Sequence, residues 1–121
     1  MAWEKLIKKY VNLYQFTSFS YQKRLPNNKI PDLISQDQTI IIECKLHDYI
    51  RSIDQDIINY QNYCQQLIIC CLFHKRKNWQ NDFRTYSKVR FWYPEDLLNW
   101  IPLDQHATFL QELTTIKTMK K

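Results

Sequence analysis

An aspartate near the start and a glutamate and a lysine near the end frame the stretch "PDLISQDQTIIIECK", residues 31–45. Asp32 stands near its start, and Glu43 and Lys45 follow three consecutive isoleucines near its end. Carboxylates brought close together repel one another unless a proton or a cation lies between them, and hard Mg²⁺ prefers such oxygen ligands. A nearby lysine can orient or deprotonate a water molecule, or stabilise charge that develops on a phosphate. These residue types therefore suit metal-dependent hydrolysis of a phosphodiester.

The spacing of this stretch predicts a β-hairpin that brings the three side chains together. A two-residue turn at Asp37 and Gln38 would place Asp32 directly opposite Glu43, with Cβ atoms roughly 4.5–5.5 Å apart. Alternation along the strand then puts Glu43 and Lys45 on one face together with Asp32. A four-residue loop preserves this register, whereas a slip of one residue would separate the two carboxylates.

A surface hairpin in which Lys45 merely neutralises Asp32 and Glu43 would show the same spacing. Exposed ion pairs on sheets are common and individually weak, so spacing alone does not decide between a site and a solvated surface. The isoleucines at 40–42 indicate a central strand, where unpaired charge is costly. This burial favours a functional role for the three charges.

Hydrophobic periodicity predicts the elements that position these residues. Helices are expected over residues 3–14, 47–66, 94–100 and 104–121, and strands over 17–23, 30–34, 39–46, 67–73 and 88–93. Asp48 is expected to cap the second helix, and Asn27 and Asn28 are the residues best able to take a positive φ in a chain without glycine. The order predicts one three-layer α/β domain spanning residues 1–121, with a mixed central sheet flanked by helices.

The two half-motifs resemble the signature of the PD-(D/E)XK nuclease superfamily, with Pro31-Asp32 as the first half and Glu43-Cys44-Lys45 as the second. The helix, three-strand, helix, strand order over residues 3–73 is similar to the common core of that family. The resemblance implies a restriction-endonuclease-like fold. It also implies that Asp32 and Glu43 ligate the metal, with the Cys44 backbone carbonyl as a further ligand, and that Lys45 serves the nucleophilic water. Many members add an acid from the first helix, and Glu4 is the candidate here; an acid in a first turn equally favours the helix dipole.

Within the superfamily, the small size and the late "VRFWYPEDLL" resemble archaeal-type Holliday junction resolvases, and compact homing or restriction endonucleases are similarly built. The chain departs from resolvases because no glycine-rich basic segment precedes Glu4. Gln55 and Gln61 lie where related nucleases often carry a supporting glutamine or lysine, although solvated helix residues are the more ordinary interpretation of both.

Charge along the chain is uneven and suggests a polyanionic partner. Residues 1–29 sum to +5, residues 30–73 to −4, residues 74–90 to +5 and residues 91–121 to −1. An acidic centre between two basic arms suits a nucleic acid held over an acidic metal site, although solvated faces would give the same pattern. The expected nucleic-acid-binding residues are Lys5, Lys8, Lys9, Lys75, Arg76, Lys77, Arg84, Lys88 and Arg90. Trp79, Phe83 and Tyr86 are interleaved among them and could stack on bases or pack back on the core.

Other reactive residues give weaker signals. Cys44, Cys64, Cys70 and Cys71 lack metal-ligand spacing and are expected to be buried free thiols. His74 and His106 have no identifiable partner, and the absence of glycine excludes the usual phosphate-binding loops. The amphipathic, charged N-terminus and the lack of a long apolar run lead us to expect a cytoplasmic, intracellular protein with no membrane partner.

The sequence therefore predicts a Mg²⁺-dependent DNA endonuclease, with Mn²⁺ able to substitute, that acts on duplex or branched DNA through metal-activated water. Cutting both strands requires two sites, so a homodimer or higher homo-oligomer is expected. A catalytically inactive nucleic-acid-binding or assembly module on the same fold, and an RNA endonuclease, remain alternatives because the backbone presented to basic residues is the same.

Overall fold

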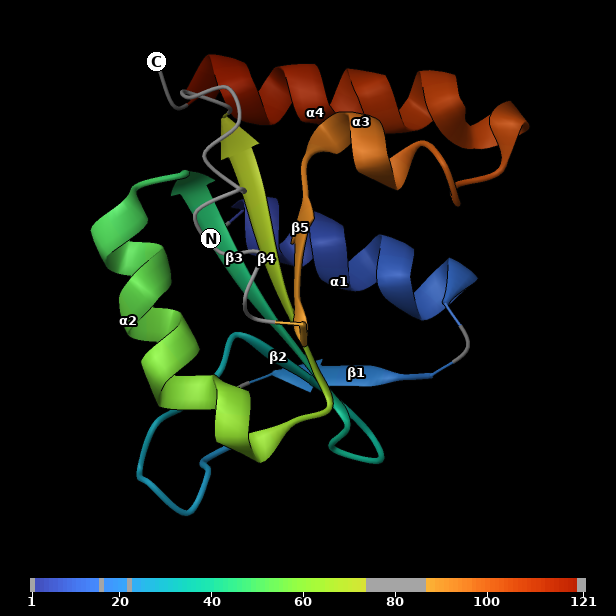
Figure 1. The fold of residues 1–121 in the computed structure, drawn as a ribbon. Helices are drawn as coiled ribbons and strands as arrows, with labels where there is room; N and C mark the ends of the chain where they lie inside the picture. The colour runs from blue at the N-terminus through green and yellow to red at the C-terminus, as the bar shows by residue number, and fades with distance from the viewer. Residues whose placement is uncertain (1, 16, 22, 74–86, 120–121) are drawn as a thin grey trace.

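The chain forms an α/β structure in which helices flank a mixed sheet (Figure 1). This computed structural model describes residues 2–15, 17–21, 23–73 and 87–119. The elements are α1 (Ala2–Tyr14), β1 (Phe19–Tyr21), β2 (Leu33–Ser35), β3 (Ile40–His47), α2 (Ile50–Tyr60), β4 (Gln66–Phe73), β5 (Val89–Trp92), α3 (Pro94–Leu97) and α4 (His106–Met119), with short 3₁₀ turns at Gln61–Tyr63 and Leu103–Gln105. The predicted order of helices and strands is confirmed. No helix within these residues has the length and apolar character that a bilayer crossing requires.

The five strands lie in the order β1-β2-β3-β4-β5 and change direction at β3. The pairs β1–β2 and β2–β3 are antiparallel, whereas β3–β4 and β4–β5 are parallel. Helix α2 makes the crossover between β3 and β4. Residues 67–72 of β4 are all buried, as expected for a continuous apolar run covered on both faces.

Two apolar clusters cover the two faces of the sheet. The α1 face is built from α1, α3, α4 and the sheet residues that point toward them: Leu33, Ile42, Cys44, Ile68, Cys70 and Leu72. The α2 face is built from α2 and the alternate sheet residues: Ile34, Ile41, Leu67, Ile69, Cys71 and Val89. Alternate residues of β4 enter the two clusters, which explains why residues 67–73 form a continuous apolar run.

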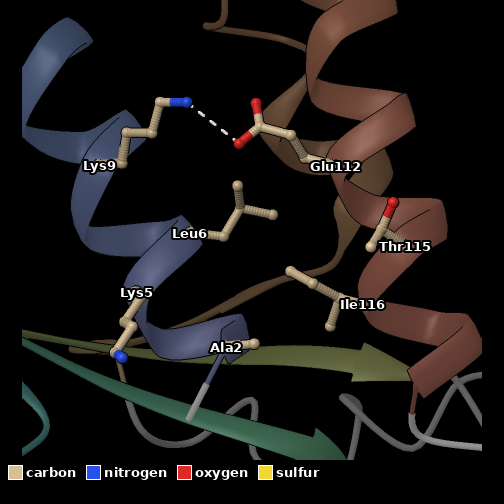
Figure 2. A pocket seen from close by; sticks show the side chains of 7 residues that line it. All are labelled: Ala2, Lys5, Leu6, Lys9, Glu112, Thr115 and Ile116. Carbon is tan, nitrogen blue, oxygen red and sulfur yellow. Dashed lines mark hydrogen bonds and ion pairs between the residues drawn. The ribbon is translucent and has the colours of Figure 1, made fainter.

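Helices α1 and α4 pack side by side on the α1 face. The indole Nε1 of Trp3 donates to the Cys70 carbonyl at 3.0 Å, which fixes α1 over β4. The Tyr10 ring meets the Phe109 ring edge-on, with centroids 5.1 Å apart. A groove of about 380 Å³ runs between the helices, and Figure 2 shows Lys9 reaching across it to Glu112. Their charged atoms lie 3.0 Å apart.

Two residues take the positive φ angles that glycine would otherwise supply. Asn28 has φ 66°, as predicted, and Gln38 has φ 62°, which was not predicted. The β2–β3 loop contains four residues, 36–39, which is the longer of the two loops compatible with the predicted register. The Asp37 carboxylate accepts hydrogen bonds from the Ser35 hydroxyl and from the Thr39 amide and hydroxyl, which closes the loop.

Several predicted details at element ends are wrong. The N-cap of α2 is Tyr49 and has no side-chain cap bond, while Asp48 is buried and accepts a hydrogen bond from the Tyr93 hydroxyl at 3.1 Å. The predicted cap failed because a residue 45 positions away in sequence captures the carboxylate. Helix α2 and strand β1 are both shorter than predicted, and a 3₁₀ turn at Gln61–Tyr63 follows α2. The prediction that Asp96 lies in the first turn of a helix is confirmed, and its carboxylate accepts the Tyr93 N–H at 2.8 Å.

Candidate active site

The β2–β3 hairpin has the predicted register. Leu33 pairs with Ile42 and Ile34 pairs with Ile41, which is the alignment that sets Asp32 opposite Glu43. The ladder ends there, because Asp32 lies just before β2 and its carboxylate, not its backbone, accepts the Cys44 N–H at 2.8 Å. Strands β2 and β3 therefore stop pairing at the position of Asp32 and Glu43.

Glu43 projects from β3 on the α2 face and is 6% exposed. It is hydrogen-bonded to Asp32, and the hydroxyl of Tyr60 on α2 is a second partner. Burial raises the pKa of Glu43 to about 10, and the hydrogen bond with Asp32 and the charges of Asp32 and Asp56 act in the same direction. The Tyr60 hydroxyl opposes this shift and also donates to the Ile30 carbonyl at 3.1 Å. The raised pKa favours the protonated form of Glu43, which can donate a hydrogen bond to Asp32.

Glu4 reaches the same point from α1, in the opposite helical layer. Burial is the largest cause of the raised pKa of Glu4, and the charge of Asp32 and a hydrogen bond with Asp32 raise that pKa further. The structure therefore brings the acid of the first helix against Asp32. The sequence does not decide whether Glu4 faces the sheet, because Glu4 lies at the border of the apolar stripe of the helix.

Lys45 is held from α2 by two oxygen atoms. Its Nζ lies 2.7 Å from an Asp56 carboxylate oxygen and donates to the Ser52 hydroxyl at 2.7 Å. Burial raises the pKa of Asp56, while the hydrogen bond and charge of Lys45 oppose that shift. The ammonium group is fixed in position beside Glu43, two residues back on the same face of β3.

Sequence reasoning missed Asp56 and Tyr60. It considered Gln55 and Gln61 on this helix, but Gln55 is exposed and donates to the Asn59 side chain at 3.2 Å. The available signal was a stripe at positions 52, 56 and 60, spaced four apart and adjacent to the buried Ile53 and Ile57. Polar residues that flank a buried stripe at this spacing point to the same layer as the sheet.

Four carboxylates and one ammonium group meet at this site: Glu4, Asp32, Glu43 and Asp56 with Lys45. Burial is the main cause of the raised pKa of Glu4, Glu43 and Asp56, and the neighbouring negative charges act in the same direction. Protons or a cation can relieve the repulsion among these acids. Because the N–H and C=O of one strand residue point to the same edge, the Cys44 carbonyl faces the edge where its N–H meets Asp32. Hard oxygen donors are thus available where the strands part.

Among the described residues, no group of three or more His, Cys, Asp or Glu side chains is arranged to hold a metal ion. A Mg²⁺ ion does not require such a group, since it commonly takes one or two protein carboxylates and completes its shell with water and phosphate. The donors Asp32, Glu43 and the Cys44 carbonyl fit that manner of binding. These oxygen donors do not suit softer metals, which prefer thiolate ligands. The four thiols are buried, and burial raises the pKa of each, so thiolates are not available.

The predicted nucleic-acid-binding residues that can be placed are scattered. Lys5 and Lys9 line the α1–α4 groove, where Lys9 pairs with Glu112 (Figure 2). The Lys8 ammonium lies over the Tyr21 ring, 4.2 Å from its centroid. Lys88 donates to the Gln61 and Cys64 carbonyls after α2, and Arg90 donates to nearby backbone carbonyls. Lys75, Arg76, Lys77 and Arg84, with His74, Trp79, Phe83 and Tyr86, lie outside the described residues.

Two further predictions concern residues away from this site. His106 contacts the Ile101 carbonyl through Nε2 at 2.8 Å and lies at the start of α4. The four cysteines are buried free thiols, as predicted.

Comparison with known proteins gave no relatives: no family model, no curated protein and no solved structure matches the chain. The function must therefore be argued from the site itself.

Proposed function

We propose that this protein is a Mg²⁺-dependent DNA endonuclease of the PD-(D/E)XK type. The observation that carries the proposal is the parting of β2 and β3 at Asp32 and Glu43, with Lys45 on the same face. An acidic cluster this buried costs folding free energy, which a purely structural hairpin has no reason to retain. The restriction-endonuclease-like fold belongs to the same proposal, and the element order from α1 to β4 supports it.

Asp32 and Glu43, with the Cys44 carbonyl, would hold Mg²⁺. When bound, the ion would lower the pKa of a coordinated water and neutralise charge on the scissile phosphate. Glu4 lies against Asp32 and would orient that carboxylate. Since Mn²⁺ accepts the same oxygen donors, it should substitute for Mg²⁺.

Lys45 would orient the attacking water and stabilise charge on the phosphate. Asp56 and Ser52 fix its ammonium group at 2.7 Å each, so little side-chain entropy remains to be lost when the substrate arrives. Asp56 is therefore a positioning residue that acts through Lys45. Basic residues on α1 and in the stretch 75–90 would contact the DNA backbone.

Cleavage of both strands of a duplex requires two such sites, so we propose that the protein acts as a homodimer or higher homo-oligomer. Exposed apolar side chains in the described C-terminal half, Leu103, Leu110 and Met119, supply surface for such a contact.

The test is a cleavage assay on duplex, four-way-junction and single-stranded DNA in Mg²⁺, in Mn²⁺ and in EDTA. The wild-type chain should cut at least one of these substrates in either metal and none in EDTA. Glu43→Gln and Lys45→Ala should each lose cleavage while unfolding cooperatively, and Glu112→Gln on the α1 face should retain it. Cleavage that persists in EDTA or in Glu43→Gln, or a wild-type chain that cuts no DNA, would overturn the proposal; cleavage of RNA alone would reassign the substrate.

A further inference from the structure

A cavity of about 310 Å³ opens beside Lys45, along the part of β3 that β2 does not cover. It is lined by Cys44, Lys45, Leu46, His47, Tyr49 and Ser52. The carboxyl end of β3 and the start of α2 meet at this place (Figure 1). The cavity thus shares Cys44, Lys45 and Ser52 with the candidate active site, but none of the four carboxylates lines it.

One side of this cavity is polar and suits a phosphate. The ammonium group of Lys45 and the hydroxyl of Ser52 lie 2.7 Å apart. Since the Cys44 N–H points to the β2 edge, alternation turns the Leu46 N–H to the same edge, past the end of the β2 ladder. His47 adds a buried Nδ1 that has no hydrogen-bond partner among the described residues. Buried polar atoms normally have a partner, and a ligand could supply this one.

The other side is aromatic. The rings of Tyr49 and His47 lie 5.3 Å apart, and the His47 ring stacks on Phe73 at 5.2 Å with an interplanar angle of 21°. Tyr49 is the outermost ring and is 54% exposed, although it stands at the junction of a strand and a helix. An exposed ring backed by two others is a rigid surface on which a planar base can stack.

We propose that this cavity binds an unpaired nucleotide next to the scissile phosphate, with its base stacked on Tyr49 and its phosphate directed to Lys45. The inference rests on the proposed function and names its substrate class: nucleic acid with an unpaired nucleotide at the point of cleavage. A base within a continuous duplex is stacked between its neighbours and would have to be extruded, at a cost of a few kcal/mol, before it could reach Tyr49.

The experiment measures binding without cleavage, so its outcome does not depend on catalysis. A fully paired duplex and the same duplex with an internal unpaired tract, labelled with 2-aminopurine, are titrated with protein in EDTA. Tyr49→Ala should weaken binding of the unpaired tract roughly 5- to 100-fold, as expected for loss of one base–aromatic stack, and should abolish quenching of the label. Binding of the paired duplex should not change. Tyr49→Phe keeps the ring and should bind as wild type.

Ile58→Ala is the matched control, because Ile58 also projects from the α2 region and is 59% exposed but does not line the cavity. Wild-type affinity for the unpaired tract in Tyr49→Ala, or an equal loss for both substrates, overturns the inference. If Tyr49 dependence holds but no metal supports cleavage by the wild type, the proposed function fails while the nucleotide site stands. If cleavage is metal-dependent but does not depend on Tyr49, the proposed function stands while the nucleotide site fails.

Discussion

The two faces of the sheet bury similar apolar clusters but treat charge in opposite ways. On the α1 face, charged groups stay at the rim: Lys9 and Glu112 pair across the groove, and both remain partly exposed. On the α2 face, Glu43 is buried beside Asp32 and Tyr60, and Lys45 and Asp56 form a largely buried pair. A buried acid and a buried ion pair stabilise a fold less than apolar side chains of the same size would. Buried charge is thus concentrated on the α2 face, where it lowers stability, whereas apolar side chains fill the α1 face.

The largest effect is expected on the α1 face. Phe109→Ala removes a ring that is 0% exposed and packs edge-on against Tyr10. The free energy of unfolding should fall by about 3–5 kcal/mol, as for other buried Phe→Ala changes. Urea denaturation measures the loss, and the cleavage rate per folded molecule should stay at the wild-type value. If Phe109→Ala keeps its free energy of unfolding but loses cleavage, the α1 face contributes to cleavage and not only to stability.

Substitution of Asp56 is expected to have a smaller effect, which falls on the cleavage rate and not on the free energy of unfolding. Asp56→Asn weakens the hold on Lys45 and should slow metal-dependent cleavage roughly 10- to 100-fold, equivalent to the 1.5–3 kcal/mol of a charge-assisted hydrogen bond. Asp56→Glu should recover part of the rate, and Asp54→Asn on the exposed side of α2 should have none of this effect. Single-turnover kinetics give the rates. Equal rates in Asp56→Asn and Asp54→Asn would show that Asp56 does not act through Lys45.

The hairpin and its three charges could be predicted from sequence, because the determinants are local. An even loop length, alternating side chains and three isoleucines fix the register whether the loop contains two residues or four. Gln38 with its positive φ was missed, since glutamine rarely takes that conformation and the loop is closed by Asp37.

The residues that could not be predicted depend on contacts between distant elements. Asp48 looks like a helix cap in sequence, yet Tyr93, which follows the edge strand β5 at the same end of the sheet, binds it. Asp56 becomes part of the site only because α2 crosses over β3 at Lys45. The approach of Glu4 to Asp32 likewise depends on how α1 docks, which the Trp3–Cys70 hydrogen bond fixes.

Glu43 on the α2 face should make the free energy of unfolding depend on pH, by about 1–2 kcal/mol. Burial and Asp32 raise the pKa of Glu43 from 4.5 to about 10, so the folded chain keeps a proton that the unfolded chain releases. Its contribution to stability is fully present below 4.5 and is lost as the pH rises toward 10. Without metal, the free energy of unfolding should therefore be lower at about pH 8 than at about pH 5, and Glu43→Gln should reduce that slope. An unchanged slope in Glu43→Gln would assign the dependence to other groups.

The smallest effect is expected at the rim of the α1 face. Glu112→Gln removes an exposed ion pair with Lys9, and its partner Tyr10 can still donate to the amide oxygen. The free energy of unfolding should change by less than about 1 kcal/mol, with no change in cleavage. Denaturing Glu112→Gln and Asp56→Asn under the same conditions compares the two faces directly. A loss of cleavage in Glu112→Gln would place the α1–α4 groove in the functional surface.

If the acidic cluster around Asp32 and Glu43 holds a divalent cation, as we propose, Mn²⁺ binding can be followed by electron paramagnetic resonance. The wild-type chain should bind Mn²⁺ in competition with Mg²⁺, Asp32→Ala and Glu43→Gln should each lose that binding, and Glu112→Gln should retain it. Undiminished Mn²⁺ binding in Glu43→Gln, or its absence from the wild type both alone and with uncleaved DNA, would contradict the account.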